Sequence, residues 1–378
     1  IQFSKIAVVV LNQIVRPFTA KWHRKELQGA FSDKSECNAF RNDLQKLQIN
    51  LRKYSALLAR LSEVEDITDL EKVEEILSNL LTGSYLESNI NDMCLRVVKA
   101  GGKRIRPKLA ILAYHALNKK EFYKRALNFA AATELLHTAT LVHDDVIDKA
   151  DCRRGKETLN NTDGNHAAVL AGDYLFTKCF MCLHDVDKPQ LYKDVSNTLS
   201  ALVSGEINQL ENQGKIDITI EDYLETIYCK TGALFELTTS GVAILTDSTN
   251  EEVTALKEYG KQLGIAFQVA DDILDYTSDK DKLGKPVGED LFDGRITLPL
   301  IYALEDPCID HALLKDAIEH NKLDIVLDCI KKSNAIEKAY EFATNAAAKA
   351  KESLNCLKQS EYVQMLCDLA DHAVKRDK

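Results

Sequence analysis

The chain has 378 residues, of which 45% are hydrophobic and 28% charged, as in an ordinary globular protein that buries a substantial core. Its net charge of −10 argues against nucleic acid as the main partner, because nucleic-acid binding depends on an excess of basic charge. Only 6 Pro and 16 Gly interrupt long runs of Ala, Leu, Glu and Lys, which predicts an all-α fold. Ten Cys without a secretory signal indicate reduced thiols and a cytoplasmic location. No apolar run reaches the ~20 residues of a membrane-spanning helix.

Residues 1–66 are expected to form a helical extension of unknown role, and residues 67–378 the functional domain. The first 60 residues hold 11 Lys and Arg against 4 Asp and Glu, so the extension is basic although the whole chain is acidic. Apolar residues from Phe40 to Leu61 recur at spacings of four and three, which is a heptad pattern. The extension is therefore expected to pack on the protein's own body or on a partner, and peripheral contact with a membrane surface stays open.

The first candidate binding motif is G-G-K-R-I-R-P at residues 101–107, where Lys103, Arg104 and Arg106 follow two glycines. Arg and Lys pair well with phosphate oxygens, and a glycine-rich turn allows a phosphate to approach the backbone. Taken alone the motif is weak evidence, because short basic loops are common on protein surfaces.

An acidic helix is predicted at residues 134–148, because apolar residues recur there at helical spacing. Asp144, Asp145 and Asp148 lie three or four positions apart on it, so their carboxylates project near one another. Like charges at this spacing destabilise a helix by ~0.2–0.5 kcal/mol per pair. An apolar helix that carries them nevertheless indicates a function.

The same D-D-x-x-D pattern returns at Asp271, Asp272 and Asp275, again within an apolar helical run. One such cluster is as readily explained by a solvated acidic face, but two with identical spacing favour a metal site. Mg²⁺ is usually held by a few carboxylates together with substrate phosphates. Two facing clusters would therefore hold a diphosphate through shared metal ions.

Several other polar positions each allow two interpretations. Arg153 and Arg154 follow the first cluster, and they either balance its charge or bind the same phosphates. Lys230 and Thr231 interrupt an apolar run, so they either extend to the surface or face a polar cavity. Gln268, three residues before the second cluster, poses the same alternative. The polar loop between residues 277 and 297 suits a lid over a charged substrate.

Together these motifs resemble the trans-isoprenyl diphosphate synthases, or polyprenyl synthetases. The similarity runs from about Thr68 to the C-terminus and rests on the order and spacing of G-G-K-R-I-R-P, H-D-D-V-I-D, K-T-G-A-L-F-E, F-Q-V-A-D-D-I-L-D and G-K-P-V-G-E-D-L. It implies an isoprenoid-synthase helical bundle around a deep central cavity, with the two Asp-rich helices facing each other. The implied reaction joins isopentenyl diphosphate to an allylic diphosphate (dimethylallyl, geranyl, farnesyl or geranylgeranyl) and releases pyrophosphate, giving a longer all-trans polyprenyl diphosphate.

The resemblance also implies roles for individual residues, and a homodimer as the assembly. Both Asp clusters would hold three Mg²⁺ ions, with Mn²⁺ as a possible substitute. The implied set is Asp144, Asp145, Asp148, Asp271, Asp272 and Asp275 for metal, Arg153, Lys230 and Lys285 for the allylic diphosphate, Lys103, Arg106, His137 and Arg154 for isopentenyl diphosphate, and Thr231 and Gln268 as oxygen dipoles toward the reacting cation. His137 could instead be a satisfied core histidine, and His143 is expected to be structural.

Arg295 stands where the family more often has Lys, so the outer substrate contact expected there is in doubt. Two alternatives to a synthase stay open. A class I terpene cyclase shares the first Asp motif, but the repeated D-D-x-x-D argues against it. A non-catalytic regulatory subunit would be expected to have lost one Asp motif, and this chain keeps both.

Product length is expected to depend on the helix face that precedes Asp144. Thr140 and Ala139 lie about one turn away, or ~6–7.5 Å along the axis. In the resembling family a bulky aromatic residue there stops growth early, whereas Ala139 leaves that level open and Leu136 could form a lower floor. The sequence therefore predicts a product longer than geranylgeranyl diphosphate.

Overall fold

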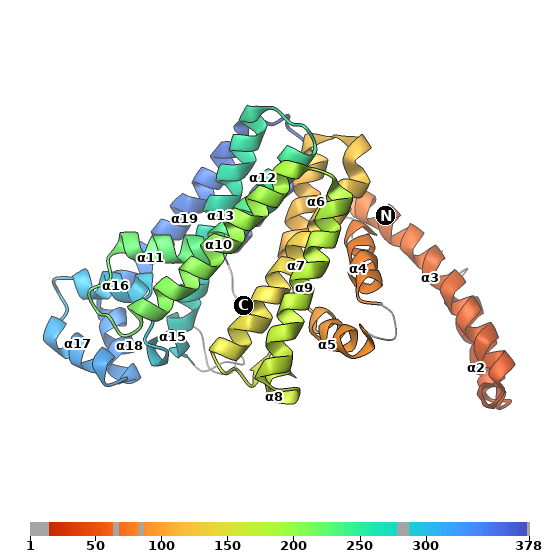
Figure 1. Ribbon diagram of the computed structural model, residues 1–378, viewed down its shortest axis with the longest axis horizontal. Coiled ribbons are helices and arrows are strands. Elements are labelled where there is room, and N and C mark those ends of the chain that lie inside the picture. Colours follow the sequence, from red (N-terminus) through yellow and green to blue (C-terminus); the bar gives the residue numbers. More distant parts are fainter. Residues whose placement is uncertain (1–14, 63–67, 83–86, 278–286, 376–378) are drawn as a thin grey trace. The chain divides into compact units, whose positions relative to one another are not determined.

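The computed structural model describes residues 15–62, 68–82, 87–277 and 287–375, and the chain divides into two compact units, Ile1–Glu74 and Glu75–Lys378 (Figure 1). The division falls within helix α4, which spans Thr68–Leu80.

The N-terminal unit is organised around one buried aromatic side chain. Trp22 is 3% exposed, and its ring packs against those of Phe31 and Phe40 at centroid distances of 6.1 and 5.1 Å. These rings join the elements that precede α4, namely α2 (Arg16–Glu26), the 3₁₀ turn η2 (Ala30–Ser32) and α3 (Lys34–Ser62). The predicted helical extension is therefore helical where it is described.

The heptad stripe of α3 is half-buried at Phe40, Leu44, Leu47 and Leu51, and its later side chains lie outside the described residues. Part of the basic charge of this unit is neutralised internally. For example, Lys21 pairs with Asp43 on α3.

The second unit is a bundle of helices, and the predicted all-α fold is confirmed. Within its described residues the strands are limited to a short antiparallel pair, β1 (Cys152–Arg153) and β2 (Lys156–Glu157). Its α-helices are α5 (Ser88–Val98), α6 (Ile105–Leu117), α7 (Tyr123–Ile147), α8 (Leu159–Thr162), α9 (Asn165–Val186), α10 (Pro189–Asn212), α11 (Ile220–Ile227), α12 (Ala233–Leu245), α13 (Asn250–Thr277), α15 (Glu289–Phe292), α16 (Leu298–Glu305), α17 (His311–Glu319), α18 (Leu323–Lys332), α19 (Ala335–Ser353) and α20 (Glu361–Val374). Short turns are η4 (Lys120–Phe122), η5 (Tyr228–Gly232) and η6 (Leu354–Cys356).

Two long helices, α7 and α13, form the centre of this bundle (Figure 1). Helix α7 packs against α6 and α9, and α13 packs against α12 and α19. The part of α7 from Ala126 to Leu136 is buried on every side, as expected for a helix that is apolar all round. The small side chains of α19 pack against its neighbours, since Ala339, Ala343 and Ala350 are fully buried.

Because α7 and α13 each end in an Asp-rich sequence, this arrangement places both acidic motifs inside one bundle. None of the helices in the described part of the chain is long and apolar enough to cross a lipid bilayer.

Candidate active site

The three carboxylates of the first Asp cluster point in different directions. Asp145 is buried, and its Oδ1 accepts a hydrogen bond of 2.6 Å from Nε of Arg153. Asp144 is half-buried, whereas Asp148, the residue that follows α7, is exposed. The predicted helix and spacing are therefore present. The helical twist, however, gives Asp145 an arginine partner and leaves Asp144 and Asp148 on another side.

The second cluster lies near the C-terminal end of α13, and its members differ in burial. Asp271 is exposed, but Asp272 is buried and accepts hydrogen bonds from the Tyr223 hydroxyl at 2.6 Å and from Nε2 of Gln268 at 2.8 Å. Asp275 accepts the backbone N–H groups of residues 289 and 290 at 3.1 and 3.2 Å, and so caps the N-terminus of α15. Asp272 and Asp275 therefore already accept hydrogen bonds from within the protein.

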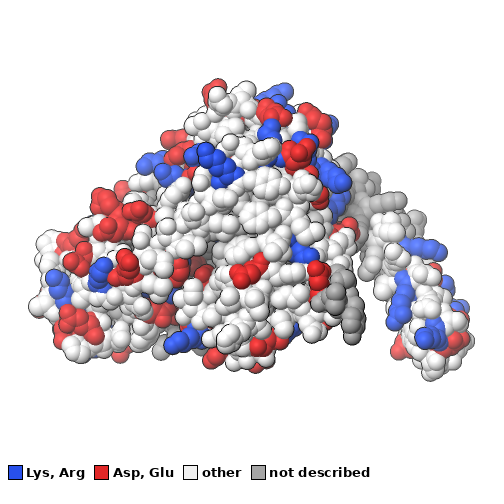
Figure 2. Space-filling model, viewed as in Figure 1, with Lys and Arg blue, Asp and Glu red and all other residues white. Residues whose placement is uncertain are grey.

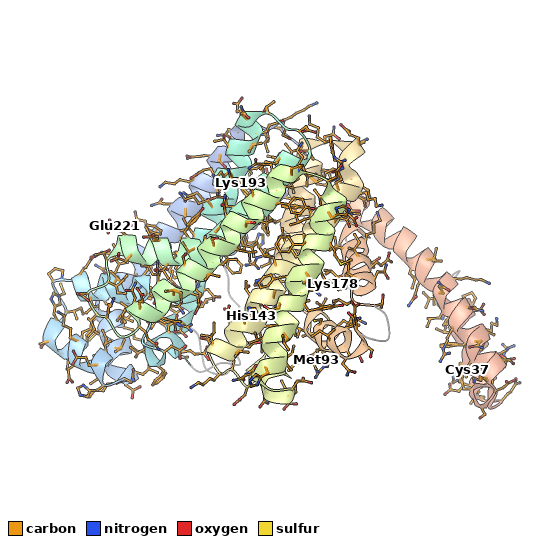
Figure 3. The ribbon with its side chains drawn as sticks, viewed as in Figure 1. Cys37, Met93, His143, Lys178, Lys193 and Glu221 are labelled. Carbon is orange, nitrogen blue, oxygen red and sulfur yellow. The ribbon has the colours of Figure 1, made fainter. Side chains whose placement is uncertain are left out.

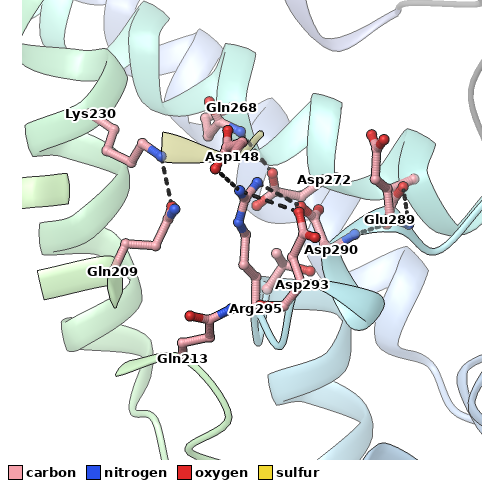
Figure 4. Close-up of polar contacts among 12 residues, drawn as sticks. Asp148, Gln209, Gln213, Lys230, Gln268, Asp272, Glu289, Asp290, Asp293 and Arg295 are labelled. Carbon is pink, nitrogen blue, oxygen red and sulfur yellow. Dashed lines mark hydrogen bonds and ion pairs between the residues drawn. The ribbon is translucent and has the colours of Figure 1, made fainter. Parts of the chain in front are cut away.

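Arg295 joins the end of the first cluster to two carboxylates of the segment that follows α13 (Figure 4). Its Nη2 lies 3.2 Å from Oδ1 of Asp148 and 3.3 Å from Oδ2 of Asp293, and its Nη1 lies 3.6 Å from Oδ1 of Asp290. Burial lowers the pKa of Arg295, but these carboxylates outweigh it and raise that pKa above its ordinary value. The guanidinium thus provides positive charge between the end of α7 and the loop after α13.

Crowding of carboxylates perturbs their ionisation. Burial, reinforced by Glu206 and Asp148 and opposed by Lys230, raises the pKa of Asp144 to about 6. Burial and the neighbouring Asp275 raise the pKa of Asp290 to about 7. Such shifts mean that the ionised forms lack sufficient compensating positive charge.

The donor set fits Mg²⁺, which prefers carboxylate oxygens and would supply the missing charge. Among the described residues no three His, Cys, Asp or Glu side chains stand together as a ready-made metal site. Mg²⁺ ordinarily completes its coordination with water and substrate phosphates, so a preassembled protein cage is not required.

Lys230 and Thr231 lie on the π-helical turn η5, a type of turn that often marks functional sites. Nζ of Lys230 contacts Oε2 of Glu206 at 2.8 Å and Oε1 of Gln209 at 2.9 Å. The Thr231 hydroxyl donates to Oε1 of Gln268 at 2.8 Å, so a chain of hydrogen bonds links η5 to Asp272.

Close packing holds this turn against α13. A Cβ at Gly264 would lie 2.7 Å from Cα of Gly232, so only glycine fits at that position of α13. Of the two interpretations of Lys230 and Thr231, the structure therefore favours the polar cavity inside the bundle. Lys230 lines that cavity together with Gln268 and Asp272 of the second Asp cluster's helix.

A cluster of positive charge surrounds His137 on α7. Burial, followed by Arg106, Arg154, Arg153 and Arg104 in decreasing order, lowers the pKa of His137 well below its ordinary value. The imidazole is therefore neutral at pH 7, and its neighbours form a site of positive potential suited to an anion. His137 and three of these arginines line a cavity of about 890 Å³ between α5, α7 and the β1–β2 hairpin.

The structure separates some residues that were predicted to act together. Lys103 lines a different cavity, of about 420 Å³, with Phe235 and Phe267. Arg106 remains near His137, but it is only half-buried, its guanidinium lies 4.9 Å from the Phe235 ring centroid, and desolvation lowers its pKa to about 10. Lys285 lies outside the described residues.

The residues expected to control product length lie on α7. Ala139 and Leu136 are fully buried, and the half-buried Thr140 donates its hydroxyl to the backbone carbonyl of His137 at 2.8 Å. The expected structural role of His143 agrees with its position between α7 and α9 (Figure 3), where Nε2 lies 3.1 Å from the carbonyl oxygen of Val169.

Sequence reasoning missed several residues of this site, among them Glu134, Glu206, Gln209, Tyr223 and Asp290. Glu206 and Gln209 had a detectable signal, because they are polar residues three positions apart on one face of α10. Asp290 lies in the motif G-K-P-V-G-E-D-L, but no role was expected for it there, and Tyr223 had no sequence signal because its contact depends on how distant helices meet.

Comparison with known proteins agrees with this arrangement. A match to the family described as Polyprenyl synthetase spans residues 87–339. The chain is 37% identical over 324 residues to octaprenyl diphosphate synthase of Escherichia coli, covering 82% of this chain and 100% of that protein. The chain belongs to the polyprenyl synthetase family. It is a prenyltransferase, which joins isopentenyl diphosphate to an allylic diphosphate, and enzymes of this family depend in general on Mg²⁺.

Two further relatives extend the comparison. The chain is 42% identical over 284 residues to an all-trans-nonaprenyl-diphosphate synthase (geranyl-diphosphate specific) of Rhodobacter capsulatus, covering 74% of this chain and 87% of that protein. A crystal structure of a decaprenyl diphosphate synthase from the same organism matches with a TM-score of 0.76 and 31% identity, covering 86% of this chain and 99% of that one. This chain therefore resembles members of the polyprenyl synthetase family both in sequence and in its all-α isoprenoid synthase fold.

Proposed function

We propose that this polyprenyl synthetase extends an allylic diphosphate beyond geranylgeranyl diphosphate, using both Asp clusters and the arginine cluster around His137. The observation that carries this proposal is the contact of Arg295 with Asp148, Asp290 and Asp293, which joins the end of α7 to the segment after α13, whose backbone is bound in turn by Asp275. A site with excess carboxylate on one side and excess guanidinium on the other suits two diphosphates, one bound through metal and one bound directly.

The metal-binding half consists of the accessible carboxylates. Asp144, Asp148 and Asp271 would hold the Mg²⁺ ions directly, while Asp272 and Asp275 support them through their hydrogen bonds within the protein. We propose three ions, with Mn²⁺ as a substitute. Bound Mg²⁺ would stabilise the negative charge that develops on the departing diphosphate.

The side chains on η5 and α13 would act on the reacting carbon. Lys230, which contacts Glu206 in this structure, would bind the allylic diphosphate when that ligand arrives, together with Arg153. The Thr231 oxygen, fixed by its hydrogen bond to Gln268, directs a lone pair toward the allylic cation and stabilises it electrostatically. Preorganisation of this oxygen avoids reorientation at the moment of reaction.

The diphosphate of isopentenyl diphosphate would bind at the arginine cluster. Arg106 and Arg154 are charged and close to His137, whose neutral imidazole can donate a further hydrogen bond to a phosphate oxygen. Lys103 would reach this site only by turning from its present cavity. The double bond of isopentenyl diphosphate attacks the allylic cation, and the released pyrophosphate accepts the proton, so no protein base is needed.

We also propose a homodimer formed through α9 and α10. Several large apolar side chains on these helices are exposed, including Leu170, Met181, Val203 and Ile207, and Figure 2 shows that the face over α9 and α10 is largely uncharged. A second copy would bury this apolar surface. Sedimentation equilibrium of Ile207→Asp beside wild type tests it, and an unchanged monomeric mass of both proteins would disprove the dimer.

The proposal includes peripheral contact of the basic N-terminal extension with an anionic surface or a partner, and a cytoplasmic location. A vesicle co-sedimentation assay with phosphatidylserine tests the first point. Binding that does not depend on residues 1–65 would contradict it.

Incubation of the full chain with Mg²⁺, isopentenyl diphosphate and each allylic primer, followed by mass spectrometry, tests the function. We expect polyprenyl diphosphates with more than four isoprene units. Hydrocarbon products formed without isopentenyl diphosphate would favour a terpene cyclase instead. No product from the folded chain alone, with activity restored by a second protein, would favour a regulatory subunit.

A further inference from the structure

Three basic residues near the arginine cluster have an unusual backbone conformation. The non-glycine residues of the described chain with φ between 48° and 54° are Arg104, Asn118, Lys149, Arg154, Asp187, Asp247 and Asn321. Asn and Asp tolerate this left-handed region, but a long side chain with a Cβ does so only at an energetic cost. At Arg104 and Arg154 we attribute this conformation to the contacts that their side chains make.

The side chain of Arg104 makes two well-defined contacts in the protein interior. Its Nη1 donates to Oε1 of Glu134 on α7 at 2.7 Å, and its Nη2 donates to the carbonyl oxygen of Val98 at the end of α5 at 2.6 Å. The Arg104 and Glu134 side chains are only 13% and 5% exposed. Arg104 thus ties the basic loop at residues 101–104 to two helices at once.

Arg154 holds the same loop from the other side. Its guanidinium donates to the carbonyl oxygen of Gly101, and a Cβ at Gly102 would lie 2.5 Å from Nη1 of Arg154. Glu134 is the largest nearby counter-charge for both Arg106 and Arg154, since it raises the pKa of each while burial lowers it. One buried carboxylate is therefore shared by three of the arginines near His137, namely Arg104, Arg106 and Arg154.

We propose that Arg104 and Glu134 are positioning residues, which hold the basic loop and the neighbouring arginines in the geometry that binds the diphosphate of isopentenyl diphosphate. This inference rests on the proposed function of the arginine cluster. Arg104 itself does not contact the substrate, because its guanidinium is committed to Glu134 and to the Val98 carbonyl. Glu134 allows several arginines to stay close together before any anion arrives, and so the site is preorganised.

Two charge-preserving variants test this role. Arg104→Lys keeps the positive charge but loses the planar fork that reaches two acceptors, and Glu134→Asp keeps the negative charge but withdraws it from Arg104. Each is expected to raise KM for isopentenyl diphosphate roughly tenfold, as a displacement of binding groups does. KM for the allylic primer is expected to stay within about twofold of wild type, because that substrate binds at the Asp clusters.

The double variant Arg104→Lys/Glu134→Asp is expected to lose less than the sum of the two single losses, since both changes weaken the same Arg104–Glu134 interaction. Arg125→Lys is the matched control. Arg125 lies on the first turn of α7, pairs with Asp187 at 3.4 Å and is remote from the site, so its substitution should change neither KM.

Three results would overturn the inference: an unchanged KM for isopentenyl diphosphate in both single variants, equal increases in KM for both substrates, or additive losses in the double variant. If a single variant does not fold, Arg104→Asn/Glu134→Gln replaces it, because Asn tolerates the left-handed backbone and both charges of the Arg104–Glu134 pair are removed together. The same rise in KM for isopentenyl diphosphate is expected from this pair, and an unchanged KM would refute the positioning role. A wild-type chain that forms no product would instead contradict the proposed function.

Discussion

Replacement of Arg295 by Met should destabilise the metal-free protein much more than the metal-bound protein. Each contact of its guanidinium with Asp148 or Asp293, at 3.2 and 3.3 Å, corresponds to about 5 kcal/mol of attraction at an effective dielectric constant of ~20. Desolvation offsets most of this attraction. Loss of one partner costs about 3–5 kcal/mol in a buried pair and about 0–1 kcal/mol in an exposed one. The Arg295 side chain is 27% exposed, so we expect a loss of about 2 kcal/mol.

In differential scanning calorimetry this loss corresponds to a decrease in Tm of about 2–3 °C for a protein of this size, measured in EDTA. Saturating Mg²⁺ supplies the missing positive charge, so the decrease should shrink to less than about half. Arg125→Met serves as the control, since its partner Asp187 is not part of the site. An equal decrease in EDTA and in Mg²⁺ would refute the counter-charge reasoning. A larger decrease with Mg²⁺ and pyrophosphate would show that Arg295 binds phosphate directly.

Four further outcomes are expected. Asp271→Asn should lose at least ~10³ in turnover with its circular dichroism spectrum intact, and near-normal turnover would rule out the two-cluster mechanism. A chain that starts at Asp66 should keep its turnover on water-soluble substrates, and an inactive but folded truncation would show that the extension builds part of the site. Ala139→Tyr should shorten the product seen by mass spectrometry without abolishing condensation, because the ring occupies the path of the growing chain. Mg²⁺ affinity measured by calorimetry should fall as the pH is lowered through about 6, because protons compete with the metal for the carboxylate of Asp144, whose pKa is about 6; an affinity independent of pH would contradict this.

The raised pKa values of Asp144 and Asp290 determine how the stability of the folded protein changes with pH. Both folded pKa values lie above the ~3.9 of an unfolded Asp, so the folded metal-free protein binds more protons than the unfolded chain between these limits. Its stability should therefore decrease as the pH rises from about 4 to about 7, and urea unfolding at several pH values measures this. Added Mg²⁺ should reduce the decrease, because it compensates the ionised carboxylates.

The Asp clusters were predictable from sequence because they depend on local geometry. A D-D-x-x-D pattern in an apolar run determines both the helix and the relative positions of its carboxylates, and both helices are present as predicted. The sequence did not distinguish the members of each cluster. Asp145 pairs with Arg153, and Asp275 caps α15, because those partners are brought in by the loops that follow each helix.

Other features could not be predicted, because they arise where distant segments meet. The π-helical turn that carries Lys230 depends on the close approach of Gly264 on α13, which no local pattern in the turn itself reveals. Glu134 has the sequence context of an ordinary helix residue, and only the left-handed Arg104 beside it shows that it balances a group of arginines. The sequence shows Arg295 in place of the more frequent Lys. The contacts of its guanidinium with Asp148, Asp290 and Asp293 depend on the tertiary structure and could not be predicted.

The two halves of the site differ in how their internal counter-charges can behave when substrates bind. Glu134 is buried beneath the arginines and tied to Arg104, so a diphosphate can be added to that half without removing it. Arg295 instead occupies the space between the carboxylates that would bind metal, so its contact with Asp148 must change when Mg²⁺ enters. In the proposed site, isopentenyl diphosphate would therefore meet a preformed arrangement of charges, whereas the metal and the allylic diphosphate would have to displace the contact between Arg295 and Asp148. The conformational cost of binding would then fall on the allylic substrate, whose diphosphate leaves in the reaction. The binding energy of the metal ions could offset that cost.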